Sequence, residues 1–364
     1  MTTVTAAVAI APKRTELQAF PLPAIPADGG LLRIEAAGVC GSDWPAYQRV
    51  AQPKILGHEN VGRIVEIGAI ARERWGVEAG DRVVIEEYLP CGFCEWCRAE
   101  DFRLCDQTDI WMGGMRYGST TTEIPPALWG GFGQYQFLHP RSVLHRIDDD
   151  VPAELAALAI PLSNGFQWAC IEAGATFGKT VVVQGPGQQG LACVVAAKNA
   201  GASRVIISGL PADARRLELA KRLGADDTFI NDGTESLTEF VREATGGRMA
   251  EIVIETSSGG PQTIVDAFGL VRKHGTLILG GEKHRPIPAF DADPIVSRTV
   301  RVQGVRGHSY RAVELALELI RSQRFPLHEL CTNSFSLDEV DQALRTLGGE
   351  LGNDAIHVTV LPWR

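Results

Sequence analysis

The chain has 364 residues, which is long enough for two domains, since single domains usually contain about 100–200 residues. Its composition is that of an ordinary globular protein, with 45% hydrophobic and 22% charged residues. The formal net charge of −9 disfavours a nucleic-acid or anionic-membrane surface, and no run approaches the roughly 20 apolar residues of a membrane span. We therefore expect a cytoplasmic protein without a nucleic-acid or membrane partner.

The first 160 residues are rich in glycine and proline and contain short runs typical of strands. Examples are Leu31–Ala37, Val61–Ile67 and Arg82–Ile85. Such runs, separated by turn residues, predict an irregular β domain.

From about Thr180 the pattern changes to short β-branched runs that alternate with helical stretches. This alternation predicts a doubly wound parallel sheet of the Rossmann type, and hence an α/β protein. One further helix, Val313–Arg321, and short strands follow. We predict one domain from residues 1–160 with 301–364, and a dinucleotide-binding domain from residues 161–300.

A glycine-rich motif follows the first strand of the predicted parallel sheet. The strand Thr180–Gln184 runs into Gly185-Pro186-Gly187-Gln188-Gln189-Gly190, and a helical stretch comes next. In this context the glycines permit a tight turn, the approach of a pyrophosphate and close helix packing, while the helix N-terminus at Gln188 and Gln189 attracts the phosphates. The motif predicts a nicotinamide dinucleotide site.

The residue that would bind the adenosine ribose is less plainly marked. The second strand ends at Ser208 and Gly209, where an Asp or Glu is usual. Asp213 is a candidate for the ribose hydroxyls, with Arg215 or Arg216 beside it, but it could equally be a helix N-cap. We expect NAD rather than NADP.

Four cysteines occur on one short segment, as Cys91, Cys94, Cys97 and Cys105. Four thiolates complete a tetrahedral shell with no open position, which predicts a structural zinc site, with an iron–sulfur cluster as the competing interpretation.

Three further motifs extend the pattern: Gly38-Val39-Cys40-Gly41-Ser42-Asp43, Gly57-His58-Glu59-x2-Gly62-x5-Gly68 and Gly80-Asp81-Arg82-Val83. With the cysteine spacing and the glycine loop, they make nearly the whole chain resemble the zinc-type medium-chain alcohol dehydrogenases. The resemblance implies a GroES-like first domain, Cys40 and His58 as catalytic zinc ligands, and Ser42 as a proton-relay hydroxyl. It also implies a homodimer or homotetramer and a small alcohol or carbonyl substrate.

Two positions depart from the family pattern. The third catalytic ligand is replaced by Ile160, which cannot bind a metal, and Pro45 stands where many relatives place a relay histidine. Three alternatives follow: Glu59 completes the zinc shell, zinc binds weakly through two ligands and water, or the site lacks zinc and an acid such as Glu87 assists a different reaction.

Aromatic and methionine residues after the cysteine segment, with Trp44 and Tyr47, could line a pocket for a bulky substrate or could serve packing; they are Trp111, Met112, Met115, Tyr117 and Trp129. His357 could approach the cofactor pyrophosphate, although we expect an ordinary surface histidine.

The main functional prediction is a nicotinamide-dependent alcohol dehydrogenase or carbonyl reductase. The alternatives are a reductase with only the structural zinc and an inactive nucleotide-binding relative.

Overall fold

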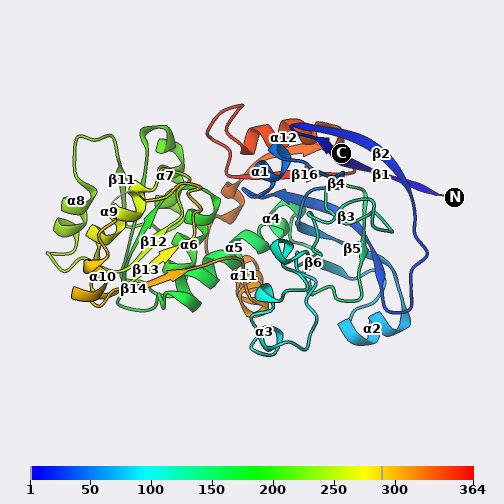
Figure 1. The fold of residues 1–364 in the computed structure, drawn as a ribbon, viewed down its shortest axis with the longest axis horizontal. Coiled ribbons are helices and arrows are strands. Elements are labelled where there is room, and N and C mark those ends of the chain that lie inside the picture. The colour runs from blue at the N-terminus through cyan, green and yellow to red at the C-terminus, as the bar shows by residue number, and fades with distance from the viewer. Residues whose placement is uncertain (1, 288–289) are drawn as a thin grey trace. The chain divides into compact units, whose positions relative to one another are not determined.

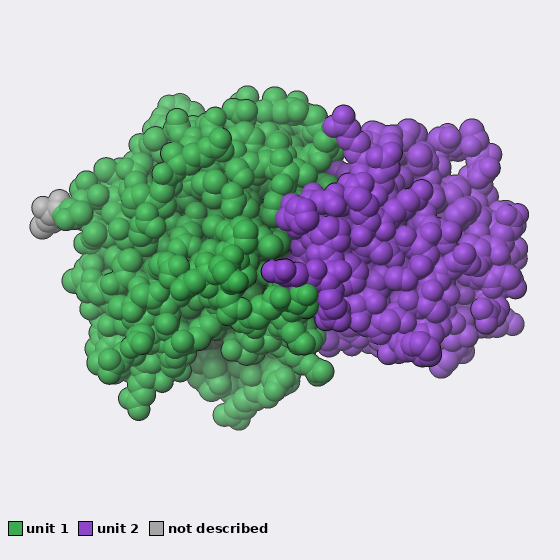
Figure 2. Space-filling view, turned by 180° about the vertical axis from the view of Figure 1, so that it is seen from behind, with its two compact units in different colours: residues 1–160, 309–322, 330–364 green, residues 161–308, 323–329 purple. Residues whose placement is uncertain are grey.

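The computed structural model describes residues 2–287 and 290–364, which form two compact units (Figure 2). The first unit contains the chain up to residue 160 together with residues 309–322 and 330–364, and the second contains residues 161–308 and 323–329. The second unit is thus an insertion in the chain of the first. Across the described residues, no helix combines the length and the apolar character that crossing a membrane requires.

The first unit is built on two sheets (Figure 1). A seven-stranded sheet has the order β15-β16-β3-β5-β6-β8, with β7 paired to β3, and a three-stranded sheet has the order β2-β1-β4. The strands are β1 (Thr3–Ala11), β2 (Arg14–Pro21), β3 (Gly30–Val39), β4 (Lys54–Ile55), β5 (Glu59–Ile67), β6 (Arg82–Ile85), β7 (Tyr135–Leu138), β8 (Leu144–Arg146), β15 (Cys331–Ser336) and β16 (His357–Leu361).

Short helices and long loops connect these strands. The helices are α1 (Asp43–Gln48), α2 (Ala69–Trp75), α3 (Glu95–Arg98), α4 (Ala153–Ala157), α11 (Tyr310–Ser322) and α12 (Val340–Leu347), and α5 (Ala159–Gly165) begins at the end of the unit's first segment. The core holds large side chains such as Tyr47, Tyr117, Trp129 and Phe132. The irregular β domain that the sequence predicts is therefore present.

The second unit is a six-stranded parallel sheet with the order β11-β10-β9-β12-β13-β14. Its strands are β9 (Thr180–Gln184), β10 (Arg204–Gly209), β11 (Asp227–Ile230), β12 (Ala250–Glu255), β13 (Val271–Leu279) and β14 (Arg301–Gly304). Its helices are α6 (Gln188–Asn199), α7 (Ala214–Arg222), α8 (Leu237–Ala244), α9 (Gln262–Leu270) and α10 (Asp293–Ser297), and a π-helical stretch, Phe166–Glu172, precedes β9. This strand order is that of the Rossmann fold, so the predicted fold class is confirmed.

The parallel sheet continues past residue 300, where the sequence suggested that the second domain ends. Strand β14 pairs with β13 from Arg301 to Gly304, and the second unit runs to His308. Residues 298–300, directly before the strand, include neither glycine nor proline that would mark a boundary, and the strand's residues are mostly exposed because β14 lies at the sheet edge.

Candidate active site

Three side chains with metal-binding donor atoms meet where β3 ends and β5 begins. Cys40 follows β3 directly, while His58 and Glu59 lie at the start of β5. The strands are antiparallel neighbours with Gly38 opposite Glu59, and this register brings the distant motifs together. The Cys40 sulfur, a His58 ring nitrogen and a Glu59 carboxylate oxygen lie within 4.8 Å of one another.

Glycine at position 38 is what lets Glu59 reach this cluster. A Cβ at Gly38 would collide with the Glu59 carboxylate and would lie 2.8 Å from His357 Cε1. His357 Nδ1 is 3.9 Å from Glu59 Oε2, and the histidine is fully buried. Burial lowers the pKa of His357 to about 4, so the ring is neutral beside the carboxylate. The expectation of a surface histidine was therefore wrong, because β16 lies inside the sheet between β15 and β3.

Carboxylates surround His58 on both ring nitrogens. Asp43 Oδ1 lies 3.4 Å from Nδ1, and Glu87 Oε2 lies 3.9 Å from Nε2. Asp43 is itself fixed because the Cys40 N–H donates to its Oδ2 at 2.9 Å. Burial lowers the pKa of His58, but Asp43, Glu87 and the Cys40 sulfur together raise it well above its ordinary value. The two carboxylates therefore favour a cation beside the His58 ring.

These donors are of the kinds that zinc prefers. Thiolate, imidazole and carboxylate are its usual protein ligands, and three of them leave one position open for a substrate. Ile160 is buried and offers no donor atom, so among the described residues the third donor in reach is Glu59. Ser42 is exposed at the N-cap of α1, and its hydroxyl makes no capping bond. The binding role of these residues remains a prediction.

Glu87 and Arg116 form an ion pair beside the cluster, which the sequence did not predict. Arg116 Nη1 lies 3.7 Å from Glu87 Oε1, and both side chains are nearly buried, at 13% and 14% exposure. Burial lowers the pKa of Arg116, but Glu87 and three further groups, Tyr88, Asp109 and Cys40, together raise it above its ordinary value. No sequence signal marked Arg116, because its loop has no regular pattern, whereas Asp43 lay inside a motif already quoted.

The four cysteines of the second motif form a compact sulfur cluster. All four sulfurs lie within 4.8 Å of one another, with Cys91–Cys97 at 3.9 Å and Cys94–Cys97 at 3.5 Å. A tetrahedron with zinc–sulfur bonds of about 2.3 Å has edges of roughly 3.8 Å, so the spacing fits zinc. Backbone N–H groups, Phe93 first, lower the pKa of Cys91 to about 6, whereas burial raises the pKa of Cys97 to about 12 and that of Cys105 as well. Cys91 therefore favours the thiolate that a metal requires, and binding of the metal would release the protons of the other two.

Each glycine of the predicted dinucleotide motif meets a different steric demand. Gly185 has φ +99° and lies against Ser257, so it permits the turn. Gly187, the N-cap of α6, has only open space where a Cβ would point. A Cβ at Gly190 would collide with the Gly185 carbonyl oxygen, so this glycine lets α6 approach the strand. The loop matches the geometry that a pyrophosphate needs.

Asp213 lies beside this loop and also serves a local structural role. Its Oδ2 accepts the Leu210 N–H at 2.9 Å, and its Oδ1 lies 3.4 Å from Arg216 Nη1. A Cβ at Gly209 would lie 3.1 Å from the Asp213 Cβ and 2.7 Å from Pro186 Cγ. Asp213 therefore caps its helical turn and is held next to the glycine loop at the same time.

A buried ion pair that the sequence argument missed lies at the carboxyl end of β12. Lys283 Nζ donates to Glu255 Oε1 at 2.8 Å, and their side chains are 4% and 0% exposed. Glu255 lies opposite Gln184 on β9, and within the described ranges Glu255 Oε2 and Gln184 Oε1 accept no hydrogen bond. Strands β9 and β12 flank the topological switch point, where dinucleotides bind, and such acceptors suit ribose hydroxyls. The end of the EIVIET strand could have indicated Glu255, but nothing marked Lys283.

The aromatic residues after the cysteine segment divide into two groups. Tyr117 and Trp129 are buried in the core of the first unit, at 1% and 2% exposure. Trp111 and Met112 are 62% and 68% exposed. The open choice between pocket lining and packing is thus resolved as packing for Tyr117 and Trp129.

Comparison with known proteins agrees with this fold and these motifs. Residues 27–149 match the alcohol dehydrogenase GroES-like domain, and residues 190–322 match the zinc-binding dehydrogenase family. The chain therefore belongs to the zinc-type medium-chain alcohol dehydrogenases, which are oxidoreductases acting on CH–OH groups.

Individual relatives cover nearly all of the chain. A probable alcohol dehydrogenase of Mycobacterium tuberculosis is 37% identical over 99% of this chain and 98% of its own length. The erythritol/L-threitol dehydrogenase of Mycolicibacterium smegmatis is 31% identical over 91% and 90%. The crystal structure of an alcohol dehydrogenase from Thermotoga maritima superposes with a TM-score of 0.87 at 26% identity, covering all of both chains.

Proposed function

We propose that this chain is an NAD(P)-dependent, zinc-type dehydrogenase that transfers hydride reversibly between a nicotinamide and an alcohol, aldehyde or ketone. The observation that carries the proposal is the convergence of Cys40, His58 and Glu59 within 4.8 Å despite Ile160. Without Glu59, only two donors would remain for a catalytic metal.

The residues of the cluster have separate roles in this proposal. When bound, zinc would lower the pKa of the substrate hydroxyl, and the nicotinamide would exchange hydride with its carbon. Asp43 faces His58 Nδ1 and fixes the ring tautomer so that Nε2 keeps its lone pair. Gly38 leaves space for the Glu59 carboxylate. Ser42, exposed after Cys40, is the proposed acceptor of the hydroxyl proton.

The charged neighbours of His58 support a polar substrate. The Glu87–Arg116 pair is nearly buried, and its carboxylate lies 3.9 Å from His58 Nε2. A hydrocarbon chain in contact with this pair would desolvate both charges, whereas additional substrate hydroxyls would bond to them. Relatives named for erythritol/L-threitol and sorbitol agree with a polyol or similarly polar alcohol.

We propose NAD as the cofactor, bound by Gly185, Gly187, Gln188, Gln189 and Gly190. Asp213, held beside the loop, would accept the ribose hydroxyls and repel a 2′-phosphate, while Arg216 is paired with it. Fluorescence titrations with NADH and NADPH test this. Tighter binding of NADPH, or an Asp213→Asn variant that still prefers NADH, would contradict the role of Asp213.

Zinc content and hydride transfer, measured together, test the proposal. Protein purified without chelator should contain two zinc ions per chain, and Cys40→Ala and Glu59→Gln should each contain one and lose activity. Glu87→Gln is the matched control, since it removes a neighbouring carboxylate and should keep both ions. One zinc in every sample would refute the catalytic zinc.

Ile160 supports one second candidate, a reductase that keeps only the structural zinc. Activity that survives chelators and the Cys40→Ala change but is lost in Glu87→Gln would identify it. NADH binding without turnover on any alcohol or carbonyl would instead indicate an inactive relative.

We also propose that the protein is a homodimer or homotetramer, as the family resemblance implies. Light scattering after size exclusion measures the oligomeric state.

A further inference from the structure

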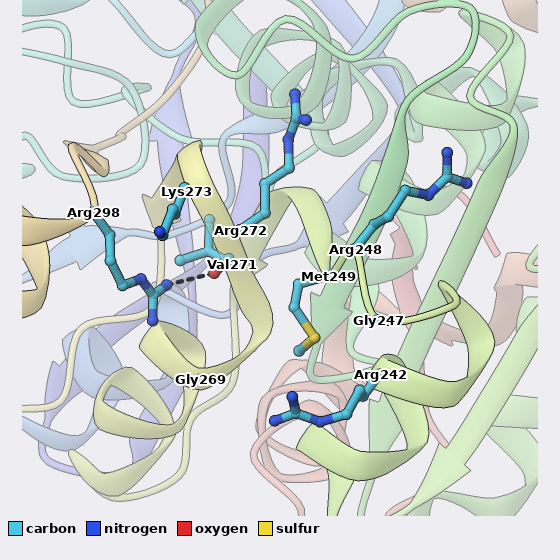
Figure 3. A pocket seen from close by; sticks show the side chains of 9 residues that line it. All are labelled: Arg242, Gly247, Arg248, Met249, Gly269, Val271, Arg272, Lys273 and Arg298. Carbon is cyan, nitrogen blue, oxygen red and sulfur yellow. Dashed lines mark hydrogen bonds between the residues drawn. The ribbon is translucent and has the colours of Figure 1, made fainter.

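A pocket of ≈ 510 Å³ in the second unit is lined by cationic side chains (Figure 3). The apolar residues Met249 and Val271 also line the pocket, and the cationic side chains are those of Arg242, Arg248, Arg272, Lys273 and Arg298. Five cations in one pocket run against the acidic character of a chain with net charge −9. Like charges that line one pocket repel one another unless an anion lies between them.

The pocket is separate from the predicted cofactor site. Its residues lie where β12 and β13 begin, and where α8, α9 and α10 end. The glycine loop and Glu255 lie at the opposite ends of the strands, namely the carboxyl ends of β9 and β12. The dinucleotide therefore cannot account for these cations.

Protein carboxylates neutralise only part of this charge. Arg242 pairs with Glu239 at 3.2 Å, and Arg272 with Glu251 at 3.4 Å. Within residues 2–287 and 290–364, Arg248, Lys273 and Arg298 form no ion pair with a carboxylate. Three positive charges are left for an external partner.

Capping of helix ends explains only a fraction of the donors in the pocket. Arg298 donates one N–H to the Val271 carbonyl oxygen, and Arg248 donates one to the Thr245 carbonyl oxygen at 3.4 Å. A guanidinium carries five N–H donors, so most of them remain available. Such cations do offset the negative ends of helix dipoles, but neither that effect nor two carbonyl bonds requires Lys273, which is exposed.

The geometry points to a binding site for a small phosphate-bearing polyanion, and we propose that a di- or triphosphate group occupies this pocket. Arginine forks match phosphate oxygens in pairs of hydrogen bonds, and a singly charged carboxylate would leave most of the cations unmatched. The volume is that of a small-molecule site, and a nucleic acid would be repelled by the acidic remainder of the chain.

Three non-glycine residues at the pocket edge have backbone angles that side chains rarely adopt. They are Met249 with φ +62°, His274 with φ +58° and Thr299 with φ +48°. Each follows or belongs to a lining segment, and such conformations persist where the surrounding structure holds them. Arg248, Lys273 and Arg298, which line the same pocket, each come directly before one of these residues in the chain.

Calorimetric titration of the zinc-loaded protein with inorganic pyrophosphate tests the site. The pocket variant is Arg248→Gln/Lys273→Gln, which removes two exposed cations without a carboxylate partner. The control is Lys221→Gln/Arg222→Gln, which removes two exposed cations from α7, although Arg222 is paired with Glu329 at 2.7 Å. Gly187→Asp places a negative charge in the glycine loop and reports any binding there. Heat from extraction of zinc would be the same in all four proteins.

One pyrophosphate per chain is expected for the wild type, the control and Gly187→Asp, with affinity that falls as salt is added. In the pocket variant the dissociation constant should rise roughly ten- to hundredfold for each cation removed.

A parallel titration with ATP identifies the ligand further. Equal affinity for ATP and tripolyphosphate means that only the phosphate chain is recognised, and tighter ATP binding means that a nucleoside is also bound. Absence of pyrophosphate binding, loss in Gly187→Asp, or equal binding by pocket variant and control would each overturn the proposal.

Discussion

A buried histidine with two carboxylate partners allows a direct test of burial against distance. His145 Nε2 lies 3.1 Å from Glu86 Oε1, and its Nδ1 lies 2.6 Å from Glu314 Oε1. His145 and Glu86 have side chains at 0% exposure, whereas that of Glu314 is 44% exposed. Distance alone ranks Glu314 as the partner that attracts His145 more strongly. Burial ranks Glu86 first, because a charge pair away from water is less screened.

The expected magnitudes differ severalfold. Breaking a buried ion pair costs about 3–5 kcal/mol, and Glu86→Gln should fall at the lower end because Glu314 still faces the ring. Glu314→Gln should cost about 0–1 kcal/mol, as for other solvent-exposed pairs. Both changes replace a carboxylate by an amide of the same shape, so neither leaves a cavity. At about 2–4 °C per kcal/mol, Glu86→Gln should lower Tm by roughly 6–12 °C.

The pH dependence gives a second readout. Burial lowers the pKa of His145, but Glu314 and Glu86 raise it above its ordinary value of 6.5. A group with a raised folded pKa stabilises fully below its unfolded pKa, and this contribution is lost as the pH rises through the folded value. The stability difference between wild type and Glu86→Gln should therefore be largest near pH 6 and narrow towards pH 9.

Urea unfolding of wild type, Glu86→Gln and Glu314→Gln, at several pH values and fixed zinc concentration, measures these differences. Equal losses for the two variants, or a larger loss for Glu314→Gln, would show that burial does not set the strength of this pair. A difference that stays constant from pH 6 to pH 9 would show that His145 does not titrate in this range and would refute the pH argument.

Five further substitutions, one of them a control, probe the proposed metal and cofactor sites. Gly38→Ala should displace the facing carboxylate and reduce zinc from two ions per chain to one by mass spectrometry; unchanged content would contradict the proposed ligand set. Gly190→Ala should destabilise the protein by about 1–3 kcal/mol through steric overlap. Gly187→Ala should change stability by less than about 0.5 kcal/mol but weaken NADH binding, and the reverse ranking would refute the glycine roles. Cys97→Ser should lower Tm and release one zinc, whereas Cys331→Ser, outside both clusters, should not release zinc.

Local pattern was enough to predict the architecture, because hydrophobic period and glycine position act over a few residues. The strand Thr180–Gln184 and the following loop were correctly placed, and each loop glycine has the steric reason that the motif requires. The proximity of Cys40 and His58 could also be predicted, because both residues lie in motifs that resemble those of a known family.

Residues that act through long-range packing could not be found in this way. His357 joins Glu59 only because β16 lies beside β3, and that pairing links segments some three hundred residues apart. The pair Lys283–Glu255 depends on a loop without periodic pattern. The aromatic residues near Trp129 showed a composition that fits both a pocket and a core, and only burial separates the two.

The insertion of one unit into the other also sets the order in which the chain can fold during synthesis. Most of the parallel-sheet unit, residues 161–308, leaves the ribosome before β16 exists, whereas the first unit waits for its last strand. Until then β7 pairs with β3 at Gly30–Arg33, but the stretch Ala37–Val39 on the same edge has no partner, and Glu59 lacks the neighbouring His357. A nascent chain released before residue 357 would therefore carry a nearly complete nucleotide-binding unit and an open sheet edge prone to aggregation. Zinc binding by Cys40 and His58 in the proposed site can thus precede the pairing of β16 with β3.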